Sequence, residues 1–291
     1  MNTQNFWILL VLIYGIFKGS RELIKKKALN YNTGLEILLL YTLTSFAFTI
    51  PTIPQAFVLG SWWLYFAVAL KSFFVFIAWI CGFAALSKMP VGLYGILDLS
   101  GVIFSTLFAI TIIGERPKLN VFVGMVLVCL GLFLLKFQPK SKLDDKANTK
   151  IGVKYIILAF CYTGFNSMSG TMDKLLRRDN LLTSTQLQFW FMFFLSLYYF
   201  AYFVIKKIPF NFKSSVKNYR IYIMSVLLVL GDKLLFIANG AGSSVAIMTL
   251  LKQVGCIVVI IGGRIFFKEK NTLYKLLCAL IVISGIFIST V

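Results

Sequence analysis

The sequence predicts an all-α integral membrane protein with ten transmembrane helices arranged as two inverted five-helix repeats. Three observations support this fold class: the composition, the number of apolar runs of membrane length, and an internal repeat. Hydrophobic residues make up 59% of the 291 residues, whereas charged residues make up 13%. This composition is typical of polytopic membrane proteins and is hard to place in a soluble domain.

A bilayer core of about 30 Å requires roughly 17 to 25 helical residues per span. Apolar runs of this length predict spans at 6–28, 34–52, 61–87, 91–113, 118–137, 152–176, 182–205, 220–239, 244–267 and 272–290. Turn and cap residues mark the short joins between them. These residues are Asn30, Asn32, Pro51, Pro54, Pro90, Pro117, Asn180, Pro209, Gly240, Gly242 and Asn271.

One join differs from the others because it is polar, rich in lysine and free of apolar periodicity. It divides the chain into a first five-helix repeat at 1–137, a basic linker at 138–151 and a second five-helix repeat at 152–291. An odd number of spans per half requires that the two halves insert in opposite orientations. Inverted repeats of this kind are typical of secondary transporters.

The repeat is visible in the sequence itself at a constant shift of 154 residues. At this shift, apolar residues of the first half align with apolar residues of the second half almost throughout the fourth and fifth spans. The identical pairs include Gly101 with Gly255, Glu115 with Glu269, Leu119 with Leu273, and Gly131 with Gly285. Such self-similarity predicts a duplicated structural unit.

An apolar helix closed by a glutamate, then a short polar turn, then a helix with spaced glycines, occurs once in each half. This pattern resembles the EamA family of the drug/metabolite transporter superfamily, and the resemblance covers essentially the whole chain. It implies ten spans in two repeats and transport of small metabolites. One departure lies in the first helix, where family members usually carry a Trp-Gly pair and this chain has Lys18 and Gly19.

The repeated glutamates have a structural and a functional interpretation. Glu115 and Glu269 each lie where one helix ends and the next begins, beside Arg116 and Lys270, which can pair with them. We expect them to cap and turn the chain near the interface, with substrate contact as the alternative.

Spaced glycines indicate close helix packing. Gly15 and Gly19 form a GxxxG pattern in the first helix, and Gly124 and Gly131 lie along one side of the fifth. Small residues at this spacing allow two helix backbones to approach each other.

Ionisable residues inside spans are the sharper functional signal, since each costs about 2.5–3.5 kcal/mol at mid-bilayer when exposed to lipid. Asp98 and Lys252 occupy equivalent positions of the two repeats. Because the repeats are inverted, the two residues are expected about 9 Å apart along the membrane normal. We therefore predict a direct or water-bridged Asp98–Lys252 pair near the pseudo-twofold axis.

Polar and aromatic residues on helix faces shared with these charges predict a central cavity. In the first helix, Glu22 is expected to pair with Lys18 or Lys26, and 25–27 are expected to reach the membrane surface. The candidate substrate-binding residues are Tyr14, Lys18, Arg21, Lys71, Trp79, Tyr94, Asp98, Asn166, Asp232, Lys233, Asn239 and Lys252. Trp79 is expected to form an aromatic wall, and Asp98 or Asp232 to carry a coupling proton.

These charges also admit a purely structural interpretation as ion pairs that lock helices together. Against it, the cations Lys18, Arg21, Lys71, Lys233 and Lys252 outnumber the anions Glu22, Asp98 and Asp232. A buried cation without a partner is unstable unless water, deprotonation or an anionic ligand relieves it. The set therefore predicts a water-filled site for anionic or zwitterionic metabolites, such as amino acids or small carboxylates.

Other function classes lack their usual residues. The net charge of +19 lies mostly in connections between apolar runs, so we expect no nucleic-acid partner. The chain has no histidine, and its five cysteines lie within apolar runs at unrelated spacings, which argues against a metal site, a cofactor or an enzyme. A structural or receptor role and an integral-membrane enzyme remain minor alternatives.

The sequence thus favours a secondary transporter that works by alternating access. The alternative is a flippase or carrier for a lipid-linked or phosphate-bearing intermediate. We expect a multi-pass protein of the bacterial plasma (inner) membrane, without a signal peptide, with a small-molecule substrate and the bilayer as partners. A monomer suffices for transport, and a dimer is compatible with it.

The family resemblance and the loop charges predict opposite orientations of the chain in the membrane. Resemblance to the EamA family implies cytoplasmic termini. In this chain, however, lysine and arginine concentrate in the connections after the first, fifth, seventh and ninth spans. The positive-inside rule therefore favours termini outside.

Overall fold

Helices account for almost all of the described chain, because an apolar segment in a bilayer must satisfy its backbone hydrogen bonds internally. The computed structural model describes residues 6–57, 61–89, 91–98, 100–136, 152–210, 212–241, 244–267 and 272–290, and over these it is all-α. The elements are α1 (Phe6–Ala28), α2 (Gly34–Thr49), η2 (Ile50–Thr52), α3 (Ile53–Ala56), α4 (Trp62–Lys88), α5 (Val91–Asp98), α6 (Ser100–Phe108), η3 (Ala109–Ile113), α7 (Leu119–Lys136), α8 (Val153–Arg177), η5 (Arg178–Asn180), α9 (Ser184–Lys206), α10 (Phe212–Lys217), α11 (Tyr219–Gly240), α12 (Val245–Leu251), α13 (Val254–Phe267) and α14 (Thr272–Thr290). The predicted linker at 138–151 and Glu269 lie outside the described residues.

Among these residues, five helical stretches are long and apolar enough to cross a membrane. They cover 34–56, 62–88, 184–206, 219–240 and 245–266. Helices α1 and α8 also have membrane length, with 23 and 25 residues, but they carry charged and polar side chains. The chain is therefore a helical, multi-pass membrane protein whose two most polar long helices are α1 and α8.

Two predicted spans differ from the structure. The ninth, 244–267, is interrupted between α12 and α13, where Lys252 and Gln253 form a turn. The described parts of the fourth, 91–98 and 100–113, are helical and end in the π-helical turn η3. The second, 34–52, ends as an α-helix at Thr49, where Pro51 and Pro54 open η2 and α3. Proline lacks a backbone N–H and has a fixed φ, so it starts a new helical segment more readily than it continues one.

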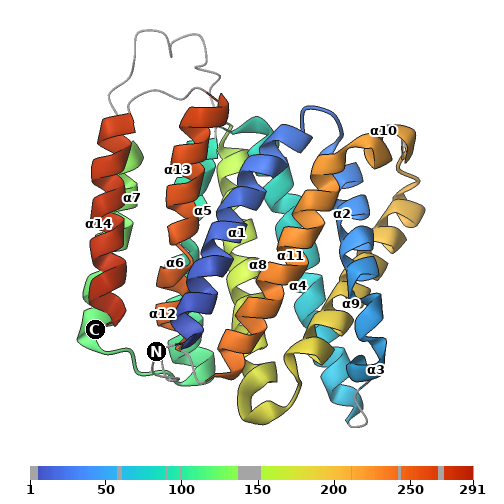
Figure 1. Ribbon diagram of the computed structural model, residues 1–291, viewed down its shortest axis with the longest axis horizontal. Coiled ribbons are helices and arrows are strands. Elements are labelled where there is room, and N and C mark those ends of the chain that lie inside the picture. Colours follow the sequence, from blue (N-terminus) through green and yellow to red (C-terminus); the bar gives the residue numbers. More distant parts are fainter. Residues whose placement is uncertain are drawn as a thin grey trace.

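The helices pair in the same way in both halves. Helices α7 and α14 lie side by side at one end of the molecule, and α2 and α9 pack together towards the other (Figure 1). Between them α1 packs against α11 and α13, whereas α8 packs against α4 and α6. Exchanging α1 with α8, α4 with α11 and α6 with α13 therefore leaves the pattern of contacts unchanged.

The equivalent helices run in opposite directions. Helix α1 begins at the lower edge of the molecule in Figure 1, and α14 ends at the same edge. Helix α1 runs upward from that edge, whereas α8 begins at the upper edge and runs downward.

Capping boxes begin α2 and α9, the second long helix of each half. The Thr33 side chain accepts a hydrogen bond from the backbone N–H of Glu36, whose carboxylate accepts one from the Thr33 backbone. Thr183 and Gln186 make the same reciprocal pair at α9. The cap satisfies backbone donors that a helix N-terminus otherwise leaves free.

The predicted close packing at glycines is confirmed for the first helix. A Cβ on Gly255 of α13 would lie 2.5 Å from the Gly15 carbonyl oxygen, and a Cβ on Gly19 would overlap the Gly255 carbonyl. In the outer pair, a Cβ on Gly285 would lie 2.7 Å from the Gly124 carbonyl oxygen. Helices α1 and α13 therefore touch backbone to backbone at the centre of the molecule.

Candidate functional site

A polar cavity lies at the centre of the helices, between α1, α4, α8 and α11. Its volume is about 90 Å³, which is space for several water molecules at roughly 10–15 Å³ each. We call it the main cavity. Its charged lining residues are Lys18, Arg21, Glu22, Lys25, Lys71, Asp173, Asp232 and Lys252.

A side cavity of about 60 Å³ adjoins the main cavity. It is lined by residues of α1, α5, α6, α8, α11 and α12, including Asp98 and Asn239. Tyr14, Lys18, Asn166, Gly170 and Lys252 line both cavities.

Helix α1 supplies one wall of the main cavity. Tyr14, Lys18, Arg21 and Lys25 recur at i, i+4, i+7 and i+11, a spacing that places them on one helix face. Because Gly15 and Gly19 hold α1 against α13, this charged stripe lies next to Lys252 at the end of α12.

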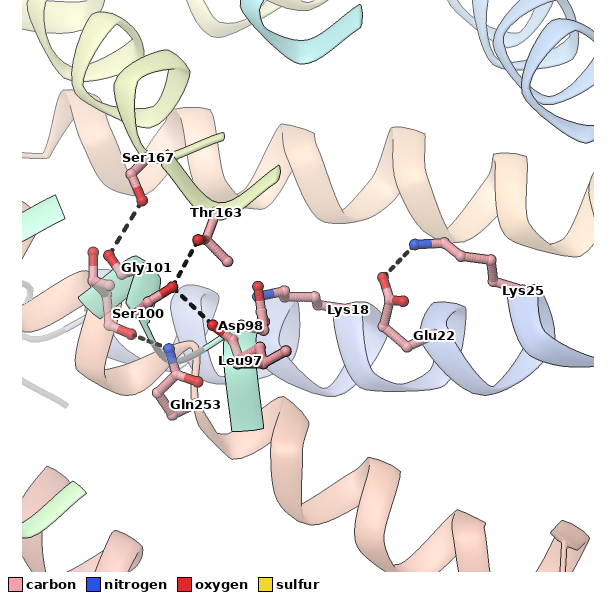
Figure 2. Close-up of polar contacts among 11 residues, drawn as sticks. Lys18, Glu22, Lys25, Leu97, Asp98, Ser100, Gly101, Thr163, Ser167 and Gln253 are labelled. Atoms are coloured by element: carbon pink, nitrogen blue, oxygen red, sulfur yellow. Dashed lines mark hydrogen bonds and ion pairs between the residues drawn. The ribbon is translucent and has the colours of Figure 1, made fainter. Parts of the chain in front are cut away.

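Lys18 and Asp98 form an ion pair between α1 and α5. The Lys18 Nζ lies 2.7 Å from the Asp98 Oδ2, and both side chains are less than one-fifth exposed (Figure 2). The predicted direct pair between Asp98 and Lys252 is wrong. Asp98 instead pairs with Lys18 of α1, which lines the side cavity together with Asp98 and Lys252.

Hydroxyl groups tie the start of α6 to α8. The Ser100 hydroxyl donates to the Leu97 carbonyl and lies 2.7 Å from the Thr163 hydroxyl of α8 (Figure 2). The Ser167 hydroxyl donates to the Gly101 carbonyl at 3.2 Å. The contacts with Thr163 and Ser167 hold the start of α6 against α8 beside the side cavity.

The ninth span is interrupted beside Lys252. Lys252 is the C-cap of α12, and the Gln253 side-chain amide donates to the Thr249 carbonyl at 3.3 Å. Lys252 therefore lies where a membrane helix is broken, at the sequence position that corresponds to Asp98 in the first half.

Lys71 and Asp173 form a second ion pair, between α4 and α8. Their charged atoms lie 3.0 Å apart, and Lys71 is 1% exposed. The Lys71 Nζ also lies 3.3 Å from the centre of the Phe191 ring. Asp173 is a site residue that the sequence prediction missed. Asp173 lies near the end of a polar helix and outside the aligned repeat positions, so neither the apolar pattern nor the repeat indicated it.

Glu22 and Lys25 form a third pair, within α1. Their charged atoms lie 2.6 Å apart (Figure 2). The predicted pairing of Glu22 with Lys18 or Lys26 is therefore wrong, and so is the expected surface position of Lys25, which is 8% exposed. The row of α1 side chains that lines the main cavity therefore extends one further turn, to Lys25.

Three charged residues of the main cavity do not form a direct ion pair with any other described residue. Within the described chain, no ion pair includes Arg21, Lys252 or Asp232, although all three line this cavity. Arg21 donates a hydrogen bond to the Tyr41 hydroxyl at 3.3 Å. Arg21 and Lys252 also lie 5.9 and 5.6 Å from the centre of the Tyr14 ring, so aromatic faces partly compensate their charge.

Aromatic rings complete the walls. Trp79 lines the main cavity and stacks on Tyr41 with 5.3 Å between ring centroids. Tyr94 packs against Tyr162 and lines a third, mostly apolar pocket of about 30 Å³ between α1, α5 and α13.

Lys233 lies outside the cavities, contrary to prediction. Its Nζ donates to the Thr185 hydroxyl of α9, on a face of α11 different from that of Asp232. Consecutive helix positions differ by about 100°, so Asp232 and Lys233 cannot both point inward. With Lys233 excluded and Lys25 and Asp173 added, the described residues that line the two cavities include five basic and four acidic ones, a smaller cationic excess than expected.

Glu115 caps a helix of the other half. Its carboxylate accepts hydrogen bonds from the Ser244 hydroxyl and the Val245 backbone N–H, both at 2.8 Å. Gly114, with φ of 76°, turns the chain into this position. The predicted capping role of Glu115 is confirmed, but its partner is the start of α12 rather than Arg116.

No family model matches the chain, and no curated protein sequence matches it. A solved structure described as "Crystal structure of protein" is similar over 99% of this chain and 99% of its own, with a TM-score of 0.77 and 12% sequence identity. This likeness shows the fold alone: the whole described arrangement has a counterpart of the same length.

Proposed function

We propose that the protein is a secondary transporter that moves a small zwitterionic or anionic metabolite across the membrane by alternating access. The observation that carries this proposal is the set of Arg21, Lys252 and Asp232, which line one central cavity and of which none is in a direct ion pair within the described chain. Buried charges of both signs that are not used to lock helices together are suited to a ligand that itself carries both signs.

Ten spans in two inverted repeats are part of the proposal. Three features support this arrangement: the matching helix contacts, the opposite directions of α1 and α8, and the capping boxes of α2 and α9. Together with the sequence pattern, they support membership of the drug/metabolite transporter superfamily, in the manner of the EamA family. A bacterial inner membrane is the proposed location, and one chain holds a complete cavity.

The interrupted ninth span supports a transport role. Broken helices in inverted-repeat transporters lie near the membrane midplane and line the substrate site. Here the break carries Lys252, which lines the side cavity together with Asp98. In this proposal the ligand carboxylate binds Arg21 and Lys252, and a ligand ammonium binds Asp232.

Asp232 is the better candidate for a coupling proton. Asp98 is held by Lys18 at 2.7 Å, whereas no ion pair holds Asp232 within the described residues. A carboxylate without a fixed cation exchanges its proton more readily than one bound in an ion pair.

A thermal-shift screen of the purified protein in detergent tests the proposed function. The ligands are amino acids, small carboxylates and, as the opposite class, small organic cations. We expect stabilisation by zwitterions or anions, in proportion to concentration and affinity. Stabilisation by cations alone would reject the proposal.

A second candidate is a carrier of a lipid-linked or phosphate-bearing intermediate. The apolar pocket favours it, because Val91, Tyr94 and Val259 lie there beside Lys18 and Lys252. A charged head could then bind at the lysines while a chain lies along the apolar wall. Stabilisation by a polyprenyl phosphate but not by inorganic phosphate or amino acids would favour this candidate.

A further inference from the structure

The side cavity differs from the main cavity in the chemistry of its walls. Beside Lys18, Asp98 and Lys252, its polar residues are uncharged amides and hydroxyls: Ser105, Thr163, Asn166, Ser167, Asn239, Thr249 and Gln253. Lys18 and Asp98 neutralise each other, so Lys252 is the only unpaired charge among the described lining residues. This wall is suited to an uncharged polar group.

Two of these side chains are buried without a partner. Asn239 is 4% exposed and Ser105 is 7% exposed. Within the described chain, no hydrogen bond satisfies the Asn239 amide or the Ser105 hydroxyl, whereas the hydroxyls of Thr163, Ser167 and Thr249 all donate to carbonyl groups. Polar groups inside proteins nearly always have a partner, and since both residues line the side cavity, water or a substrate group in it can supply that partner.

We propose that the side cavity is a second subsite that binds an uncharged hydrogen-bonding group of the substrate, a carboxamide or a hydroxyl. The inference rests on the proposed transport function, in which Arg21, Lys252 and Asp232 hold the charged head in the main cavity. Asn166 and Lys252 line both cavities, so a single small molecule can extend from one into the other.

The donor and acceptor inventory defines the ligand class. Asn239 offers two N–H donors and a carbonyl acceptor, and Ser105 offers one donor and two lone pairs. A carboxamide or hydroxyl complements both residues. An apolar group of the same size would displace water and leave them unpaired, and sites of this kind reject such analogues strongly.

Matched ligand pairs test the subsite by calorimetric titration of the full-length protein in detergent. One pair is asparagine and leucine, which are similar in size, and the other is malate and succinate, which differ by one hydroxyl. For the pair that binds, we expect the hydrogen-bonding member to bind about tenfold more tightly or better. Equal affinity for both members would overturn the subsite and leave the transport proposal standing. Binding of neither pair would reject both.

Two variants localise the preference. Asn239→Leu keeps the volume and removes the amide. It should bring the ratio of the two affinities within a ligand pair close to one, without weakening the binding of leucine or succinate. Ser105→Ala should lower the ratio about threefold. Because it removes a hydroxyl that has no protein partner, it should fold even where Asn239→Leu does not. The control is Ser196→Ala, whose hydroxyl binds the Thr42 carbonyl away from both cavities. A ratio that stays at the wild-type value in both cavity variants would overturn the subsite.

Discussion

The Lys18 Nζ lies 2.7 Å from the Asp98 Oδ2, and this ion pair joins the middle of α1 to α5. Asp98 and Lys252 occupy matching positions at the sequence shift of 154 residues, yet Asp98 pairs with Lys18 of α1 and not with Lys252. The helix contacts match between the two halves, whereas the charges at these two positions differ.

Removing one partner of this pair should destabilise the protein more than removing both. Lys18→Met leaves Asp98 uncompensated, and Asp98→Asn leaves Lys18 uncompensated. Each single change should lower the free energy of unfolding by roughly 1–3 kcal/mol, since the pair is partly exposed to the cavity.

A double-mutant cycle measured by thermal unfolding in detergent checks this pair. The double variant should lose less stability than either single variant. Strictly additive losses would show that the pair contributes no coupling. The exposed Arg178–Asp179 pair provides a control, where Arg178→Gln should change stability by less than about 1 kcal/mol.

A methyl group at Gly19 should separate α1 from α13. Its Cβ would overlap the Gly255 carbonyl, a backbone atom that cannot move aside. We expect Gly19→Ala to lower stability by about 1–3 kcal/mol, as overpacking does elsewhere. Gly170→Ala of α8 is the matched control, because nothing lies within 4 Å of its added Cβ. Equal thermal unfolding temperatures for the two variants would contradict the close approach.

Loss of the Glu115 carboxylate should weaken the start of α12. Glu115→Ala removes acceptors for the Ser244 hydroxyl and the Val245 N–H, and should cost about 0.5–2 kcal/mol. Arg116→Ala, at the exposed neighbouring position, should change little. Thermal unfolding compares the two variants, and a larger loss for Arg116→Ala would refute the cap.

The charge distribution predicts that both termini lie outside the cell. Asn30, before α2, and Ser61, before α4, are both exposed. Helices α2 and α4 begin at opposite edges of the molecule in Figure 1. In a background without native cysteines, Ser61→Cys should react with a membrane-impermeant maleimide in intact cells. Asn30→Cys should react only after permeabilisation. The opposite pattern would place the termini in the cytoplasm, as the EamA resemblance implies.

Hydropathy predicted most of the fold, because span length and turn residues are local properties of the sequence. It could not predict the interruption at Lys252 and Gln253, because apolar residues lie on both sides of it and no proline marks it. The bond from the Gln253 amide to the Thr249 carbonyl is local, whereas the close approach of Gly15 to the Lys252 carbonyl is a tertiary contact.

Most candidate site residues line a cavity because a helical stripe fixes which face they share. Ion-pair partners were harder to predict, since they depend on depth and on helix rotation. Asp98 pairs with Lys18 rather than with Lys252, and Asp173 of α8 pairs with Lys71 of α4. Lys233 points away from the cavities because it follows Asp232 directly, and consecutive helix positions differ by about 100°.

The most direct test of transport is uptake by proteoliposomes with Lys252→Met beside Lys233→Met. Both variants remove one lysine from within a span, but only Lys252 lines the cavity. For the zwitterion or anion that best stabilises the protein, Lys252→Met should reduce uptake about tenfold or more, and Lys233→Met should transport at the wild-type rate. Wild-type uptake by Lys252→Met would contradict a substrate site at the centre of the two repeats.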